Sequence, residues 1–153
     1  NHFKSMIGGR ARTKARRKAQ VKKVVEIIDA DWNEFNYDGN YMVLGDFNDY
    51  PGVGTALNAL IKNPRLEDVM KRIRLTKDRW THYWASGNQY SQLDYILLSK
   101  NLASRDPDKE PEIFRQGLPY RAENYFGKRI KGVGKNSPKA SDHAGLVMEV
   151  KLK

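Results

Sequence analysis

The chain has no cysteine among its 153 residues. Disulfide bonds, thiolate nucleophiles and cysteine-ligated zinc are therefore excluded, and the redox compartment stays undetermined. Because thiolates are missing, any metal ion here must be bound by oxygen or imidazole ligands.

Long hydrophobic runs are also missing. No apolar stretch approaches the ~20 residues that a membrane-spanning helix needs, and we find no signal-peptide pattern. Hydrophobic residues make up 39% and charged residues 30% of the chain, an ordinary balance for a globular protein. We therefore expect one domain over residues 1–153, without any indication of its cellular location.

Acidic residues are few relative to basic ones. The 28 Lys and Arg against 18 Asp and Glu give a net charge of +10. Such a surplus favours a polyanionic partner such as nucleic acid, because phosphates are attracted to a positive field and release counterions on binding. A basic surface that only maintains solubility is the alternative, and charge alone leaves both open.

A basic helix is predicted from Arg10 to about Trp32. Its cations crowd the first half, where the helix dipole disfavours them, which is a weak indication of an anionic partner against the alternative of a solvated face. Apolar residues recur at steps of three and four and predict a buried stripe: Ala11, Ala15, Ala19, Val21, Val24, Val25 and Ile28.

The remaining chain is mostly strands joined by loops, which predicts an α+β fold class. A short helix capped by Thr55 is predicted to end at Ile61. The polar or proline-bearing stretches 33–40 and 103–111 and the basic stretch 120–140 are predicted loops. Apolar or aromatic runs bounded by turn residues predict strands: 41–45, 79–85, 92–98, 112–114 and 145–153, with 1–5 ending a further strand.

Polar residues stand directly beside three of these strands. Asp46 and Asn48 follow the strand 41–45 and, two apart on extended backbone, would point to the same side. Asp94 lies inside an apolar strand, where a carboxylate is costly unless it has a partner, and His143 would serve. Each site alone is also explained by an ordinary turn or cap. Together they indicate a functional site.

These segments resemble the motifs of the endonuclease/exonuclease/phosphatase superfamily, which includes DNase I-like nucleases, sphingomyelinases and inositol-polyphosphate phosphatases. The similar segments are Gly45–Asp49, Gln92–Leu97 and Ser141–His143, in the family's order, and Asn1–Ser5 resembles its mid-chain histidine motif. The resemblance implies a two-layer β-sandwich flanked by helices. It covers nearly all of this chain but only the C-terminal part of the family's domain, so a preceding segment or a second chain would complete the fold. An isolated fragment would expose an apolar sheet face and associate.

The resemblance also implies a role for each residue in phosphodiester hydrolysis. Asp46 would orient or deprotonate the attacking water, and Asn48 would hold the phosphate or the nucleophile. His143 would contact the scissile phosphate, while Asp94 accepts its other ring N–H and fixes the tautomer. His2 would assist at the phosphate or leaving group.

A divalent metal ion is the expected cofactor. By the same resemblance Asp142 matches a metal-associated carboxylate, and Asp46 and Asn48 are the other expected metal ligands. Mg²⁺ or Mn²⁺ is expected, because the available ligands are hard oxygens. Catalytic zinc held by the three histidines is a formal alternative that their spacing does not support, and His82 alone is expected to be a packed or surface residue.

Three functions remain open from the sequence. A divalent-metal-dependent DNA or RNA nuclease accounts for the motifs and for the positive charge. A lipid or inositol phosphate phosphodiesterase or phosphatase of the same superfamily is the second reading, since a polybasic surface also suits anionic lipid. The third is a catalytically silent nucleic-acid-binding fragment.

Overall fold

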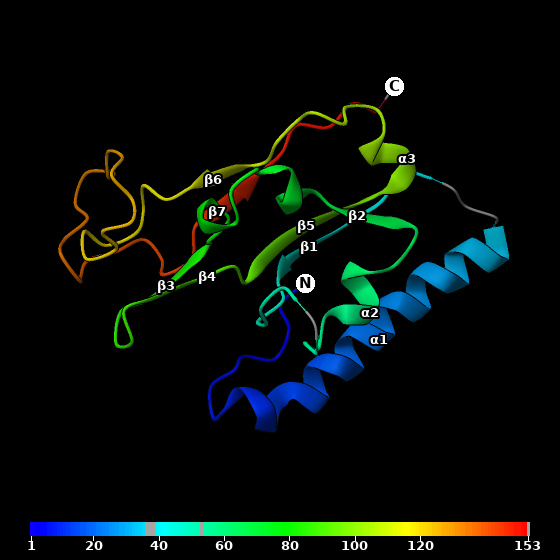
Figure 1. The fold of residues 1–153 in the computed structure, drawn as a ribbon, viewed down its shortest axis with the longest axis horizontal. Helices are drawn as coiled ribbons and strands as arrows, with labels where there is room; N and C mark the ends of the chain where they lie inside the picture. The colour runs from blue at the N-terminus through cyan, green and yellow to red at the C-terminus, as the bar shows by residue number, and fades with distance from the viewer. Residues whose placement is uncertain (36–38, 53, 153) are drawn as a thin grey trace.

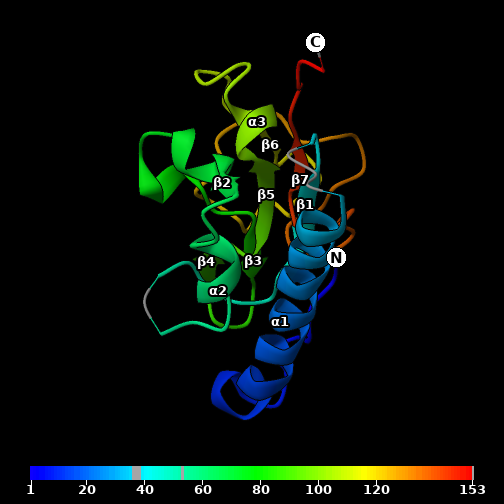
Figure 2. The same ribbon diagram turned by 90° about the vertical axis from the view of Figure 1, so that its right-hand side faces the viewer.

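A three-stranded antiparallel sheet and one long helix organise the molecule. The computed structural model describes residues 1–35, 39–52 and 54–152. The helix is α1 (Arg10–Phe35), and the sheet has the strand order β1-β5-β2. Its strands are β1 (Met42–Asp46), β2 (Leu66–Asp68) and β5 (Asp94–Ser99). Figures 1 and 2 show α1 running along one side of this sheet.

Strand β5 is the central element because both of its faces are buried. Tyr95 and Leu97 pack into a core shared with α1, and Ile96 and Leu98 pack into a second core that includes Leu146. A strand covered on both faces reads as a continuous apolar run rather than an alternating one. The residues from Tyr95 to Leu98 are therefore all apolar because they face two separate cores in turn.

Two small antiparallel pairs complete the sheets of the described residues. The first joins β3 (His82–Trp84) to β4 (Gln89–Ser91), and the second joins β6 (Glu112–Phe114) to β7 (Gly145–Val147). A single bridge between His82 and His143 links β3 to the residues just before β7. The short helices are α2 (Asn58–Ile61) and α3 (Lys100–Ala103), with 3₁₀ turns at Val69–Arg72 and Thr76–Asp78.

The predicted α+β class is confirmed as a mixed fold with small antiparallel sheets. The long helix, the strands at 112–114 and the lack of regular structure over 120–140 also agree with the sequence. The two-layer β-sandwich stays a prediction.

Several boundaries predicted from the sequence are wrong. Residues 145–153 form a strand only as far as Val147, and residues 1–5 contribute a single bridge at His2 rather than a strand. Thr55 caps no helix, because α2 begins at Asn58 and its N-cap residue makes no side-chain bond. The loop predicted at 33–40 begins later, since α1 continues to Phe35, and residues 36–38 lie outside the described part of the chain.

The first half of α1 buries a different stripe from the predicted one. Ala11, Ala15 and Ala19 are exposed, whereas Thr13 and Arg17 are buried. These two polar residues continue the helical spacing of the buried apolar residues further along α1. The sequence pattern placed this face wrongly because it counted only apolar residues.

The long loop that precedes the last strand is organised around a buried arginine. The Arg129 guanidinium donates hydrogen bonds to five backbone carbonyl groups and lies 4.4 Å from the centre of the Tyr125 ring. Peptide groups that lack sheet or helix partners are satisfied in this way by a side chain. The loop is therefore ordered without regular secondary structure.

Apolar side chains remain exposed on the strands. Met42 and Leu44 on β1, and Phe114 and Val147 on β6 and β7, are each more than two-fifths exposed. These residues are the surface on which the expected association would depend, and that association stays a prediction. Among the helices that the structure describes, none has the length and apolarity to cross a bilayer.

Candidate active site

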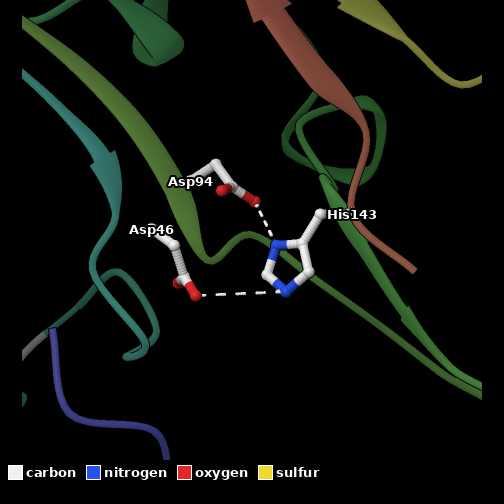
Figure 3. A group of neighbouring side chains, drawn as sticks. All are labelled: Asp46, Asp94 and His143. Atoms are coloured by element: carbon white, nitrogen blue, oxygen red, sulfur yellow. Dashed lines mark hydrogen bonds and ion pairs between the residues drawn. The ribbon is translucent and has the colours of Figure 1, made fainter. Parts of the chain in front are cut away.

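Two carboxylates and an imidazole converge at the end of the central sheet (Figure 3). His143 Nδ1 lies 2.8 Å from Asp94 Oδ2, within hydrogen-bond distance, and His143 Nε2 lies 4.0 Å from Asp46 Oδ2. Asp94 thus holds one ring nitrogen, which leaves the other directed toward Asp46. The predicted pairing of Asp94 with His143 is present in the structure.

Sheet register brings the two aspartates together. Asp46 ends β1 and Asp94 begins β5, and the two residues are directly opposite in the antiparallel register. Their side chains therefore lie on the same face of the sheet.

Backbone pairing places His143 beside them. The N–H of Ala144 donates to Thr81 O at 2.6 Å, and the N–H of Tyr83 donates to Asp142 O at 2.9 Å. The His143 N–H also bonds Ser141 Oγ at 2.9 Å. These bonds fix the segment 141–144 against β3 and so bring a residue from the C-terminal region to the end of the central sheet.

The neighbouring charges shift the pKa values of His143 and Asp46. The hydrogen bond that His143 donates to Asp94 raises the pKa of His143 above its ordinary value, although burial acts in the opposite direction. Burial raises the pKa of Asp46, and the nearby charge of Asp94 raises it further. A positive charge on His143, or on a bound cation, therefore favours the ionised form of Asp46.

Asn48 contacts Asp46, but its backbone conformation differs from the extended one that the sequence predicted. Its backbone is left-handed, with a φ of 50°, rather than extended. Its Nδ2 donates to Asp46 Oδ2 at 2.5 Å and to Phe3 O at 3.1 Å, while Asp46 Oδ1 accepts from the Asn48 N–H at 2.8 Å. Asparagine tolerates this backbone better than most residues, so the residue type is explained by conformation as well as by its amide.

His2 reaches the same carboxylate from the N-terminal segment. His2 Nε2 lies 3.5 Å from Asp46 Oδ2, and the Phe3 N–H donates to Asp46 O at 2.8 Å. The segment approaches β1 closely at Gly45, where a Cβ would lie 1.9 Å from Asn1 O. A residue with a side chain at Gly45 would therefore displace the N-terminal segment that carries His2.

Asp142 is adjacent in sequence to His143 and pairs with a lysine. Its carboxylate lies 3.7 Å from Lys139 Nζ. Burial alone would raise the pKa of Asp142, but a backbone hydrogen bond and Lys139 together hold it below its ordinary value. Its role as a metal ligand stays a prediction.

His82 packs beside His143 with the two ring centres 4.6 Å apart. Burial lowers the pKa of His82, and the neighbouring His143 lowers it further. The expectation of a packed histidine agrees with this position, although the residue also lines the cavity described next.

A cavity of about 700 Å³ opens over these residues. His2, Asp46, Asn48 and His143 line it, as does Asp142, whereas Asp94 is not part of the lining. The predicted site residues are therefore brought to one place, with Asp94 touching the cavity only through His143.

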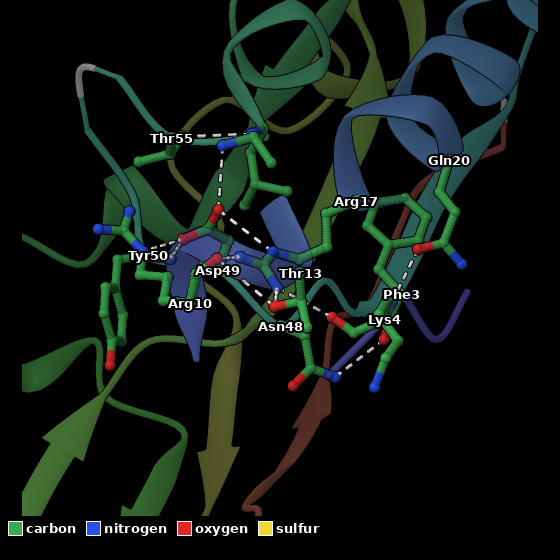
Figure 4. Close-up of polar contacts among 12 residues, drawn as sticks. Phe3, Lys4, Arg10, Thr13, Arg17, Gln20, Asn48, Asp49, Tyr50 and Thr55 are labelled. Carbon is green, nitrogen blue, oxygen red and sulfur yellow. Dashed lines mark hydrogen bonds and ion pairs between the residues drawn. The ribbon is translucent and has the colours of Figure 1, made fainter. Parts of the chain in front are cut away.

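A buried polar cluster beneath this cavity was not predicted from the sequence (Figure 4). Asp49 and Arg17 are both fully buried, with Arg17 Nε 3.4 Å from Asp49 Oδ2. Asp49 also accepts hydrogen bonds from Arg10 Nε at 2.7 Å and from the Ala56 N–H at 3.0 Å. The available signal was the position of Arg17, which continues the helical spacing of Val21 on α1.

Arg17 connects α1 to both segments that carry site residues. Its Nη1 donates to Lys4 O at 3.2 Å, next to the His2 segment, while its Nε pairs with Asp49, next to Asn48. Because a buried guanidinium needs its donors satisfied, these bonds fix the relative position of the three segments.

The group formed by Asp46, Asp94 and His143 could hold a metal ion. Each residue offers one ligand atom, and these atoms all lie within 4.8 Å of one another. Two carboxylate oxygens and one imidazole suit a divalent cation that keeps some of its water. The donor set thus fits a metal ion, and it does not identify which one.

Comparison with known proteins agrees with this geometry. A search of curated proteins found no match. The model of the Endonuclease/Exonuclease/phosphatase family matches residues 1–144, which include every residue of the site. The chain therefore belongs to the endonuclease/exonuclease/phosphatase family, a family of phosphoester hydrolases.

Proposed function

We propose that this protein is a divalent-metal-dependent phosphodiester hydrolase that cleaves nucleic acid. The observation that carries the proposal is the Asp94–His143 pair, whose free ring nitrogen faces Asp46 on the wall of the cavity. An imidazole that is held by one carboxylate and faces a second can donate to a phosphate oxygen while the second carboxylate accepts a proton.

Each residue of the site has a proposed task in that reaction. Asp46 orients the attacking water and accepts its proton. His143, held by Asp94, donates hydrogen bonds to the scissile phosphate and stabilises the charge that develops on its oxygens. Asn48 positions the phosphate or the nucleophile, and His2 assists at the leaving oxygen.

A divalent metal ion, Mg²⁺ or Mn²⁺, is proposed as the cofactor. Asp46 is the residue shared by the expected ligand set and by the group whose atoms lie within 4.8 Å of one another. When bound, the ion would polarise the phosphate and offset its negative charge. Asn48 and Asp142 are the other proposed ligands, and a site with one or two carboxylates is sufficient for an ion that retains water.

Nucleic acid is the proposed substrate because cations extend well beyond the cavity. Exposed cations cover α1, and the loop 120–140 adds more. Contacts of this type bind the phosphate backbone without reading base sequence. The same charge predicts that binding weakens steeply as salt concentration rises.

Nicking of supercoiled plasmid with Mg²⁺, Mn²⁺ or EDTA tests the proposal. We expect metal-dependent nicking that the Asp46→Asn variant loses, because removal of a catalytic base commonly costs about 10²–10⁴-fold in rate. Asp108→Asn is the matched control, since Asp108 is exposed in the loop after α3. Equal nicking by both variants would show that another protein or another site cleaves the plasmid.

Failure of the folded wild-type protein to nick DNA would refute the nuclease assignment. Hydrolysis of a small phosphodiester without DNA cleavage would direct attention to another phosphoester substrate. Binding of DNA without any hydrolysis would indicate a nucleic-acid-binding fragment.

A further inference from the structure

Arg10 is held in one orientation on the wall of the cavity (Figure 4). Its Nε donates to Asp49 Oδ1 at 2.7 Å, and its guanidinium carbon lies 4.9 Å from the centre of the Tyr50 ring. Asp49 is in turn fully buried and fixed by Arg17. The entropy of ordering the Arg10 side chain is therefore lost on folding rather than on binding a ligand.

The terminal nitrogens of Arg10 carry N–H groups that are available to a ligand. Among the described residues, none accepts a hydrogen bond from Arg10 Nη1 or Nη2. Arg10 and Tyr50 line the same cavity as Asp46 and His143. A fixed guanidinium with free terminal N–H groups matches two oxygens of a phosphate in the bidentate geometry that lysine cannot provide.

A structural role for Arg10 accounts only for its Nε. That nitrogen pairs with Asp49, which Arg17 and two backbone N–H groups also contact, and the pair makes no use of the terminal nitrogens. Arg10 is also the first residue of α1, a helix with no acidic residue in its first turn. The helix dipole disfavours a cation there, and an anion bound to Arg10 would offset that cost.

We propose that Arg10 binds a second phosphate group of the substrate, one that neighbours the scissile phosphodiester. This inference rests on the proposed function of the cavity, and it narrows the substrate to a chain that carries at least two phosphates. That second phosphate is either an internucleotide phosphodiester or a terminal phosphate monoester, and both have the oxygens that Arg10 would bind.

Short thymidylates separate these sources. The substrates are TpT, with one phosphodiester, pTpT, which adds a terminal phosphate, and TpTpT, which adds an internucleotide one. We expect Arg10→Met to reduce the kcat/KM ratio of a two-phosphate substrate over TpT by roughly ten- to a hundredfold, the usual effect of a hydrogen bond to a charged group. A drop for pTpT alone identifies a terminal phosphate, and a drop for TpTpT alone an internucleotide one. Unchanged ratios for both overturn the proposal.

Arg10→Lys is the second variant. It keeps the positive charge but loses the Nε bond to Asp49 and the planar fork, so we expect a smaller drop in the same ratios. Arg74→Met is the matched control, because Arg74 is exposed and does not line the cavity. Another outcome is that the kcat/KM ratios are the same in wild-type protein, Arg10→Lys and Arg10→Met. That result would show that the Arg10 side chain takes no part in substrate selection.

Binding without turnover keeps this test separate from that of the proposed function. The fluorescence anisotropy of labelled oligothymidylate is measured in EDTA over a series of salt concentrations. Loss of one phosphate contact in Arg10→Met should reduce the slope of log K against log salt by about 0.7 for a single strand. A reduced slope in a protein that cleaves nothing would refute the hydrolase and retain the Arg10 site, whereas an unchanged slope would refute the Arg10 site.

Discussion

Two buried arginines organise two different regions of the molecule. Arg17 lies beneath the site and pairs with the carboxylate of Asp49, whereas Arg129 lies inside the long loop and is held by backbone carbonyls and aromatic rings. The hydrogen-bond partners of Arg17 lie up to 32 positions from it in the sequence. All the hydrogen-bond partners of Arg129 lie within 11 positions.

The difference shows that a buried arginine can either connect distant segments of the chain or stabilise a single loop. Removing Arg17 leaves a buried carboxylate short of a cation and disconnects segments that carry site residues. Removing Arg129 leaves carbonyl groups of one loop without donors. The first loss should affect the whole fold and the site, and the second should stay within the loop.

Arg17→Met gives the largest expected effect. We expect it to lower the free energy of unfolding by about 3–5 kcal/mol, because it breaks a buried ion pair and leaves the partly exposed Arg10 as the remaining cation beside Asp49. Urea denaturation measures the change. The exposed neighbour provides a control, since Arg16→Met should alter stability by less than about 0.5 kcal/mol. Similar values for the two variants would remove the distinction between the two arginines.

Arg129→Met should have a smaller and local effect. Unsatisfied carbonyl groups in the loop should cost about 1–3 kcal/mol. Hydrogen exchange measured by mass spectrometry should accelerate over residues 116–140 and stay unchanged in β1 and β5. The exposed Lys128 supplies the control variant Lys128→Met. Faster exchange in the central sheet would contradict the local role of Arg129.

The comparison also predicts where pH acts. Arg17 lies beneath the site that contains the titratable group His143, whereas Arg129 is bonded to backbone carbonyls, which do not titrate. Because Asp94 raises the folded pKa of His143, the protonated imidazole contributes stability that is fully present below about pH 6.5 and lost as pH rises through the folded pKa. Asp94→Asn should lower that pKa and weaken the pH dependence.

Titration of the imidazole by NMR in metal-free protein measures the effect of Asp94→Asn. The His82 signal should respond as well, because the charges of His143 and Asp94 both contribute to its pKa. The protection of amides in the loop 116–140, relative to their intrinsic exchange rate at each pH, should not change between pH 5 and 8. An unchanged His143 titration in the variant would exclude Asp94 as the cause of the raised pKa.

Lys139→Ala should give the smallest effect. The ion pair with Asp142 is partly exposed and 3.7 Å long, and such pairs contribute about 0–1 kcal/mol. We expect a change in the free energy of unfolding near the limit of urea denaturation. A large loss would show that this link between the loop and the site carries more of the fold than either arginine suggests.

The contact between Asp94 and His143 was predicted more accurately than the boundaries of the strands. Asp94 stood out because a carboxylate in an apolar strand needs a partner, and the structure supplies His143 at 2.8 Å. Asp46 was found from its position at a strand end. These inferences needed only local sequence and the cost of burying a charge.

The missed features depend on contacts between distant segments. Arg17 and Asp49 read as a surface cation and a turn residue, and their burial follows only once α1 packs against the sheet. Strand β2 was not predicted, because its three residues, Leu66–Asp68, give too short a pattern. The last strand was predicted too long, because apolar alternation continues past the point where β6 ends its pairing.

The position of Asp46 opposite Asp94 has a consequence for ligand binding. Like charges opposite each other destabilise a sheet, and a shift of register would separate them. Such a shift is prevented because β5 places Tyr95 in one core and Ile96 in the other, so slipping by one residue would exchange the two buried sets. Apolar packing therefore holds two repelling carboxylates together before any cation arrives. Part of the cost of assembling a metal site is met by the fold, and a bound cation should raise the melting temperature even without substrate.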